Sequence, residues 1–142
     1  MKEQNFKNHT RLLLGYHGIT AFAMIALLIG SIVNLATSAK ENLYSASLIT
    51  LISVIFLFMF WYTRTFALRA QDRAIRSEEN FRYFILTGKP LPAGIKMSQV
   101  IALRFAPDAE MAELVARAVS ENLTSKEIKQ AIKNWKADHH RA

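Results

Sequence analysis

The first half of the chain is patterned as two long uncharged stretches on either side of a short polar turn. Residues 12–39 and 42–63 contain no Asp, Glu, Lys or Arg, and only Lys40 and Glu41 lie between them. The stretches are 28 and 22 residues long. A helix needs about 20 predominantly apolar residues to cross a hydrocarbon core about 30 Å thick. The pattern therefore predicts a transmembrane helical hairpin.

Basic residues flank this hairpin at both of its outer ends. Three precede the first stretch and four follow the second, namely Lys2, Lys7, Arg11, Arg64, Arg69, Arg73 and Arg76. The chain as a whole carries a net charge of +7. Basic residues close to span ends stay on the cytoplasmic side of a membrane. We therefore expect both termini in the cytoplasm and the turn on the opposite side.

A cleaved signal peptide is the main alternative for the first stretch. Lys2, Lys7 and Arg11 would form its charged region, and residues 37–39 its small-residue cleavage site. However, the apolar region of a signal peptide is about 7–15 residues long. The first stretch is much longer and a second follows at once, so an uncleaved span is the preferred interpretation.

Small or weakly polar residues recur at helical spacing in both predicted spans. They are Ala26, Gly30 and Asn34 in the first span, and Ala46, Thr50 and Ser53 in the second. Helices associate in lipid through close approach over small residues and through interhelical hydrogen bonds. We expect these residues to pack the hairpin, with Asn34 bonded to Ser47 or Thr50 for about 0.6 kcal/mol. An Asn in a span could also line a solute path, but two helices cannot enclose a pore.

The helical pattern of the second span continues past the predicted membrane. No Gly or Pro occurs until Gly88 and Pro90, which are strong helix-stop signals. The sequence therefore predicts a stalk that runs to about Leu86. Along it, residues recur with spacings of 3, 4, 3, 4 and 3, a heptad seam made of Ala67, Ala70, Ala74, Ser77, Phe81 and Phe84. Such a seam packs on another helix, either its twin in a homodimer or a later helix of the same chain.

Short amphipathic helices are predicted beyond the stalk. Ser98 is placed to cap a helix over residues 99–105, and Pro107 fits the first position of the next helix. Thr124 and Glu127 form a capping box that begins the last helix. These helices are too small to form a core alone, so we expect them to dock on the stalk.

The predicted fold is all-α and has two parts. Residues 1–63 form the N-terminal segment and the transmembrane hairpin, with spans at about 12–36 and 43–63. Residues 64–142 form a cytoplasmic helical module with 14 Lys or Arg and 9 Asp or Glu residues.

Several motifs resemble a family of short bacterial two-span membrane proteins whose function is unknown. They include 7–11 with 16–17, 71–79, 102–108 and 128–138, and the resemblance runs over nearly the whole chain. The resemblance implies a bacterial cytoplasmic membrane and the same two-span layout. It implies no activity, ligand or catalytic residue.

The residues offer little for catalysis or metal binding. The chain has no cysteine, and His9, His17, His139 and His140 have no further ligand at helical spacing. No nucleophile elbow or phosphate-binding loop is present. Acidic residues interleave the basic ones, which argues against a nucleic-acid surface. We predict no catalytic, cofactor-binding or metal-binding residues and no nucleic-acid partner.

The arginines beside the second span are the strongest candidates for a binding role. Arg64, Arg69, Arg73 and Arg76 lie where lipid headgroups would be, although they could serve only to set topology. The preferred hypothesis is a non-enzymatic membrane protein that presents a helical module to a second copy or to a cytoplasmic or membrane protein. The alternative is a protein that binds anionic lipid or senses the membrane surface.

Overall fold

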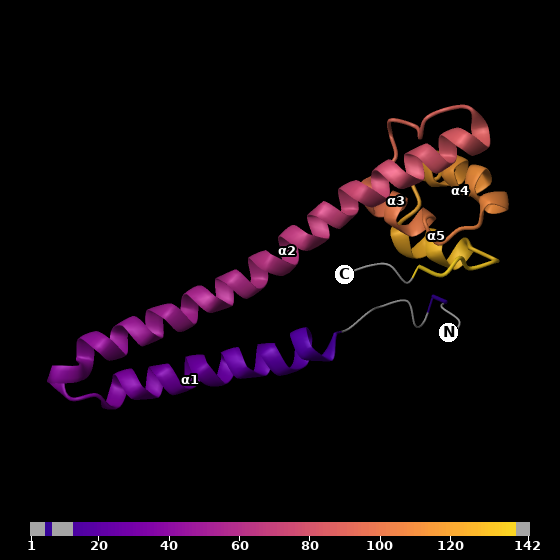
Figure 1. Ribbon diagram of the computed structural model, residues 1–142. Coiled ribbons are helices and arrows are strands. Elements are labelled where there is room, and N and C mark those ends of the chain that lie inside the picture. The colour runs from indigo at the N-terminus through magenta and orange to yellow at the C-terminus, as the bar shows by residue number, and fades with distance from the viewer. Residues whose placement is uncertain (1–4, 7–12, 139–142) are drawn as a thin grey trace. The chain divides into compact units, whose positions relative to one another are not determined.

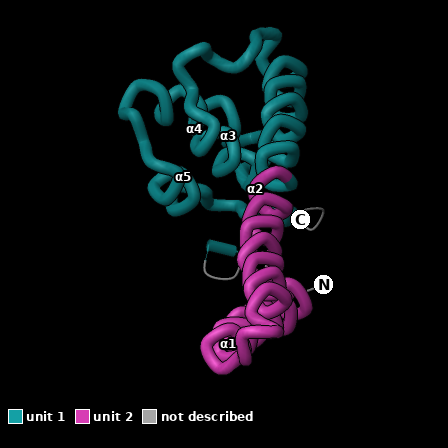
Figure 2. Tube along the Cα trace, turned by 90° about the vertical axis from the view of Figure 1, so that its left-hand side faces the viewer, with its two compact units in different colours: residues 1–10, 67–142 teal, residues 11–66 magenta. Residues whose placement is uncertain are grey.

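The computed structural model describes residues 5–6 and 13–138, and in these residues it contains helices and no strand. The chain divides into two compact units, which Figure 2 shows in magenta and teal. In chain order, the first unit is the magenta one (unit 2 in the key of Figure 2), and the second unit is the teal one (unit 1 in the key). Helix α2 (Leu43–Thr87) belongs to both units, and the division falls between Phe66 and Ala67. The continuous α2 agrees with the predicted stalk.

The first unit is an antiparallel pair of helices. A π-helical segment, η1 (Leu14–Thr20), leads into α1 (Ala21–Thr37), and a single 3-10 turn, η2 (Lys40–Asn42), connects α1 to α2 (Figure 1). Both helices are long and apolar enough to cross a membrane. Their apolar windows are only 6% and 11% buried. A helix inside a soluble core would instead be mostly covered by its own protein.

The two helices of this unit meet along one narrow face of each. On α1 the less exposed positions include Met24, Leu28, Ser31 and Leu35. On the part of α2 that belongs to this unit they include Ala46, Thr50, Ser53, Leu57 and Phe60. The spacings of 4 and 3 keep one stripe facing the partner helix. At the open end of the hairpin, the Tyr16 ring stacks on Phe60 with centroids 4.3 Å apart, and Tyr16 Oη donates to Phe60 O at 2.5 Å.

Ser31 supplies the polar contacts between these helices. Its Oγ lies 3.0 Å from Ser53 Oγ, and Thr50 Oγ1 donates to Ser31 O at 3.1 Å. The predicted hydrogen bond from Asn34 to Ser47 or Thr50 is wrong, because the Asn34 side chain is exposed and makes neither bond.

The register of α1 explains this difference. At 100° per residue, Asn34, Gly30 and Ala26 lie about 60°, 100° and 140° to one side of Ser31. All three are exposed, and a Cβ added at Gly30 would meet no atom within 4 Å. The predicted small-residue stripe of α1 therefore does not pack against α2.

Helix α2 ends where the sequence predicts. Gly88 adopts a φ of +69°, a left-handed conformation that favours glycine, and its amide donates to Phe84 O at 2.8 Å. The side chain of Asn80 then holds the following loop, since its Oδ1 accepts from the Leu91 amide at 2.9 Å. The chain turns back beside the last turns of α2.

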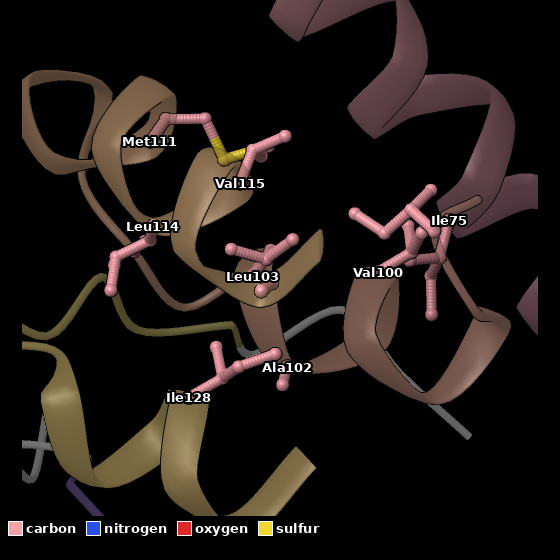
Figure 3. Close-up of a cluster of buried hydrophobic side chains, with 11 residues drawn as sticks. Ile75, Val100, Ala102, Leu103, Met111, Leu114, Val115 and Ile128 are labelled. Atoms are coloured by element: carbon pink, nitrogen blue, oxygen red, sulfur yellow. The ribbon is translucent and has the colours of Figure 1, made fainter. Parts of the chain in front are cut away.

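The second unit encloses a compact core. Three helices, α3 (Met97–Leu103), α4 (Asp108–Ser120) and α5 (Ser125–Ala131), surround it together with α2. Figure 3 shows its buried side chains, which include Ile75, Val100, Ala102, Leu103, Met111, Leu114, Val115 and Ile128. Ile75 is the residue that α2 buries in this cluster.

Local hydrogen bonds define the starts of α5 and α3 in this unit. The predicted capping box is confirmed, because Glu127 N donates to Thr124 Oγ1 at 3.3 Å and Thr124 N donates to Glu127 Oε2 at 2.7 Å. The predicted cap at Ser98 is wrong, because α3 begins at Met97. Gln99 there accepts from the Lys96 amide at 2.8 Å.

Candidate functional site

Arg82 fastens α2 to the helices of the second unit. Its guanidinium donates from Nη1 to Glu79 Oε2 at 2.9 Å, from Nη2 to Ala106 O at 2.7 Å and from Nε to Asp108 Oδ1 at 2.6 Å. Arg82 and Glu79 are mostly buried, whereas the Asp108 side chain is 66% exposed. A planar guanidinium suits this arrangement because its donors are fixed in one fork.

This network differs from the ion pair that helical spacing predicts. Glu78 and Glu79 both lie within helical reach of Arg82. A spacing of four residues alone would pair Glu78 with Arg82, but Glu79 makes the contact and Glu78 is exposed. The reason is that Glu79 lies on the same side of α2 as Ile75, where the module packs.

The predicted stalk seam lies on the opposite side of α2 from the module. At 100° per residue, the seam is centred about 140° from the face that carries Ile75, Glu79 and Arg82. All six of its residues are exposed, namely Ala67, Ala70, Ala74, Ser77, Phe81 and Phe84. Of the two partners predicted for the seam, a later helix of the same chain does not cover it.

The far end of the seam is strongly apolar. Phe81, Phe84 and Ile85 are 65%, 50% and 66% exposed. Spacings of three and four residues place them together on one helical face. Large apolar side chains grouped on a protein surface mark an interaction site. We call the side of α2 that carries the six seam residues and Ile85 the outer face.

Two unpaired charges border the outer face. Arg73 and Glu78 are exposed, and neither makes an ion pair with any residue that the structure describes. They are five residues apart and point about 140° away from each other on the helix. They therefore cannot pair within one chain.

A cleft of about 440 Å³ opens between α2 and the last described residues of the chain. Its polar lining consists of Gln71, Glu78, Glu79, Arg104, Lys136 and Asp138. Arg104 is buried. Its Nη1 lies 3.3 Å from Asp138 Oδ2, and its Cζ lies 4.7 Å from the centre of the Phe105 ring. Trp135 stacks on the same ring at 4.7 Å. Arg104 thus holds the terminal segment against the module.

Glu110 accepts hydrogen bonds from two backbone amides just beyond the end of α5. It accepts from Lys133 N at 2.9 Å and from Asn134 N at 3.0 Å. Burial raises the pKa of Glu110, but these hydrogen bonds and the one from Asn134 Nδ2 outweigh it and lower the pKa below its usual value. These bonds hold the chain in a non-helical course after α5 ends at Ala131.

Of the predicted lipid-contact residues, three share one side of α2. Arg69, Arg73 and Arg76 are exposed and lie within about 60° of each other around the helix. Arg64 is half-buried and lies on a different side, about 120° from Arg76. The structure therefore groups three of the four arginines and separates the fourth.

The histidines give no metal centre in the described part of the chain. His17 contacts its own helix, with Nδ1 3.2 Å from Leu13 N. No group of three His, Asp or Glu residues within residues 5–6 and 13–138 could hold a metal ion. His9, His139 and His140 lie outside the described residues.

Sequence reasoning missed four of the residues that make these contacts: Ser31, Arg104, Glu110 and Asp108 as a partner of Arg82. Each acts over a sequence distance of at least 19 residues, where helical spacing gives no signal. For Ser31, the polar residue within an apolar stretch was a visible hint.

The fold and these surfaces define an all-helical protein with two long apolar helices and a small helical module. A family model described as "Family of unknown function (DUF6526)" matches residues 1–142. The chain therefore belongs to this family. No curated protein and no solved structure matches it.

Proposed function

We propose that this protein is a non-enzymatic interaction module anchored in a bacterial cytoplasmic membrane by the α1–α2 hairpin. Both termini and residues 64–142 lie in the cytoplasm in this proposal. The observation that carries the anchor is the exposure of its apolar side chains. Over the two helices they remain uncovered by the protein itself, and lipid is the solvent that would cover them.

The charge pattern supports the proposed direction of insertion. The basic residues of α2 begin at Arg64, immediately after the apolar stretch, whereas the turn between the helices carries one charge of each sign. Basic residues retained on the cytoplasmic side place the turn outside. The outer face of α2 would then be presented to partners in the cytoplasm.

Membrane extraction and reporter fusions test this proposal. We expect the chain to remain in the membrane pellet after washes with high salt and with alkaline carbonate. A reporter active only in the cytoplasm should work after residue 142. A reporter active only outside should work when inserted between Lys40 and Glu41. Release by salt, or the reverse pattern of reporter activity, would refute the proposal.

A second candidate function is the binding of anionic lipid, and the common orientation of Arg69, Arg73 and Arg76 favours it. Each basic group near an anionic membrane surface contributes about 1 kcal/mol. Replacement of all three by Gln should reduce the anionic phospholipid retained by the purified chain, measured by native mass spectrometry. Replacing Lys89, Lys96 and Lys126 by Gln removes the same charge elsewhere and is the matched control. Equal lipid retention by both triple variants would refute this candidate.

A further inference from the structure

We infer that the outer face of α2 binds the outer face of a second copy of this chain, in parallel and in register. Only the parallel orientation of the two copies rests on the proposed membrane anchor. The exposure of the face and its spacing come from α2 itself.

The spacing of the outer face fits a helix as its partner. Its positions alternate by three and four residues over five intervals, from Ala67 to Phe84. This is the repeat with which two helices keep a continuous contact as they wind around each other. In heptad terms Ala67, Ala74 and Phe81 occupy a positions, and Ala70, Ser77 and Phe84 occupy d positions. Ile85 follows at an e position and widens the apolar contact.

The charges that border the face are complementary in a parallel pair of identical helices. Arg73 occupies a g position and Glu78 occupies the e position five residues later. In a parallel coiled coil, a g residue meets the e residue of the next heptad on the other helix. Arg73 of each copy would therefore face Glu78 of the other. A homodimer would form this pair twice, whereas a single chain cannot form it.

A membrane surface is a poorer occupant for the apolar end. With a rise of 1.5 Å per residue, Phe81 and Ile85 lie about 26–32 Å along α2 from Arg64, where the apolar stretch ends. Two copies inserted in the same direction would hold their α2 helices parallel at this distance. The bilayer therefore favours the orientation that the charges require.

The module does not obstruct this arrangement. It packs on the side of α2 that carries Ile75 and Glu79, which is buried. Ala74 and Glu78 line the edge of the cleft beside it, and Asn80 holds the loop at Leu91, but all six seam residues and Glu78 remain exposed. Small residues at positions 67, 70 and 74 allow close approach of two helices, and Phe81 and Phe84 add apolar area farther along.

Disulfide crosslinking in membranes tests this inference directly, because the natural chain has no cysteine. Ala70→Cys, Ala74→Cys and Ser77→Cys are placed singly in the full chain, and isolated membranes are oxidised with copper phenanthroline. A parallel pair in register brings each of these positions close to its own copy. We expect all three variants to form a covalent dimer several-fold more than Ser120→Cys, an exposed matched control on α4.

Charge reversal tests the register. In the Ser77→Cys background, Arg73→Glu or Glu78→Arg alone should lower the dimer fraction several-fold, because like charges then face each other. The combined Arg73→Glu and Glu78→Arg exchange should restore it. Phe81→Glu should also lower the dimer fraction. Adding the combined Arg73→Glu and Glu78→Arg exchange to Phe81→Glu should not restore it.

Several outcomes would overturn the inference. The first is a dimer yield no greater than that of Ser120→Cys. The second is crosslinking at only one of the three positions, which an antiparallel pair would give. The third is a covalent adduct whose mass is not that of a dimer, which would indicate a different partner. Carbonate extraction of the same membranes separates the two claims. A chain that stays in the pellet but does not crosslink refutes the dimer alone, and a chain that washes off refutes the anchor.

Discussion

Replacing Arg82 by Met tests whether the network around this residue holds the module on α2. Met preserves most of the apolar length of the side chain and removes all three donated hydrogen bonds. Glu79 would then be buried without its partner, and Ala106 O would lose its donor. We therefore expect a large loss of stability from one substitution.

The magnitude follows from the burial of each partner. Removing one member of a buried ion pair costs about 3–5 kcal/mol, because the remaining charge stays away from water. The contact to Asp108 adds little, since an ion pair with a solvent-exposed carboxylate is worth about 0–1 kcal/mol. Arg82→Met should thus cost about 3–5 kcal/mol, and Asp108→Asn only about 1 kcal/mol.

A double variant separates the lost charge pair from the lost packing. Glu79→Leu with Arg82→Met removes both charges, so no buried charge is left uncompensated. Ala106 O would still lack a donor, which costs about 1–3 kcal/mol. The double variant should therefore be more stable than Arg82→Met alone.

Fluorescence of Trp135 provides the assay. The chain has two tryptophans, and Trp61→Phe leaves the one that stacks on Phe105 inside the module. Urea unfolding of the full chain in detergent micelles then reports the free energy of unfolding of the module. If Arg82→Met destabilised no more than Asp108→Asn, or if the double variant were the least stable, the reasoning would be refuted.

Three further predictions concern other contacts. Ser31→Ala should weaken the hairpin by about 0.6 kcal/mol and Asn34→Ala should not, as measured by reversible unfolding in mixed micelles; equal effects would contradict the observed register. Leu103→Ala should destabilise the module by about 2–5 kcal/mol in the Trp135 assay, and a loss below 1 kcal/mol would contradict its full burial. Since hydrogen bonds lower the pKa of Glu110 from 4.5, its stabilising effect is present above that pH and is lost as the pH falls through the lowered pKa. Glu110→Gln should therefore reduce the loss of stability with acid, and an unchanged acid transition would contradict this role.

Local sequence signals predicted the end of α2, its continuity and the start of α5. Gly88 stops α2 because its positive φ suits glycine, and Thr124 with Glu127 begins α5 through bonds three residues apart. The absence of Gly and Pro after Trp61 predicted that α2 continues, and it does so to Thr87. These features depend on residues within one or two turns, so the sequence contains all of the necessary information.

Which side of a helix is used could not be read from spacing alone. The first apolar stretch offers two helical faces with one polar residue each, one through Ser31 and one through Asn34. Which of these two faces of α1 packs on α2 depends on which one meets Ser53 and Thr50 across the turn. In the same way, Glu79 instead of Glu78 pairs with Arg82 because Asp108 and Ala106, more than 20 residues away, fix the guanidinium.

The distribution of exposed apolar side chains in the module supports the proposed pairing of the outer face. Within residues 97–138, Val119 is the one large hydrophobic side chain that is exposed, since α3, α4 and α5 turn their apolar sides into the core. The last turns of α2 belong to the same unit, yet they expose Phe81, Phe84 and Ile85 together. The buried contact between the module and α2 lies on the side with Ile75 and Arg82. Apolar residues on the opposite side contribute nothing to that contact and leave large apolar surface in water, which is unfavourable. The concentration of exposed apolar side chains on α2 is explained if the α2 of a second copy covers these residues.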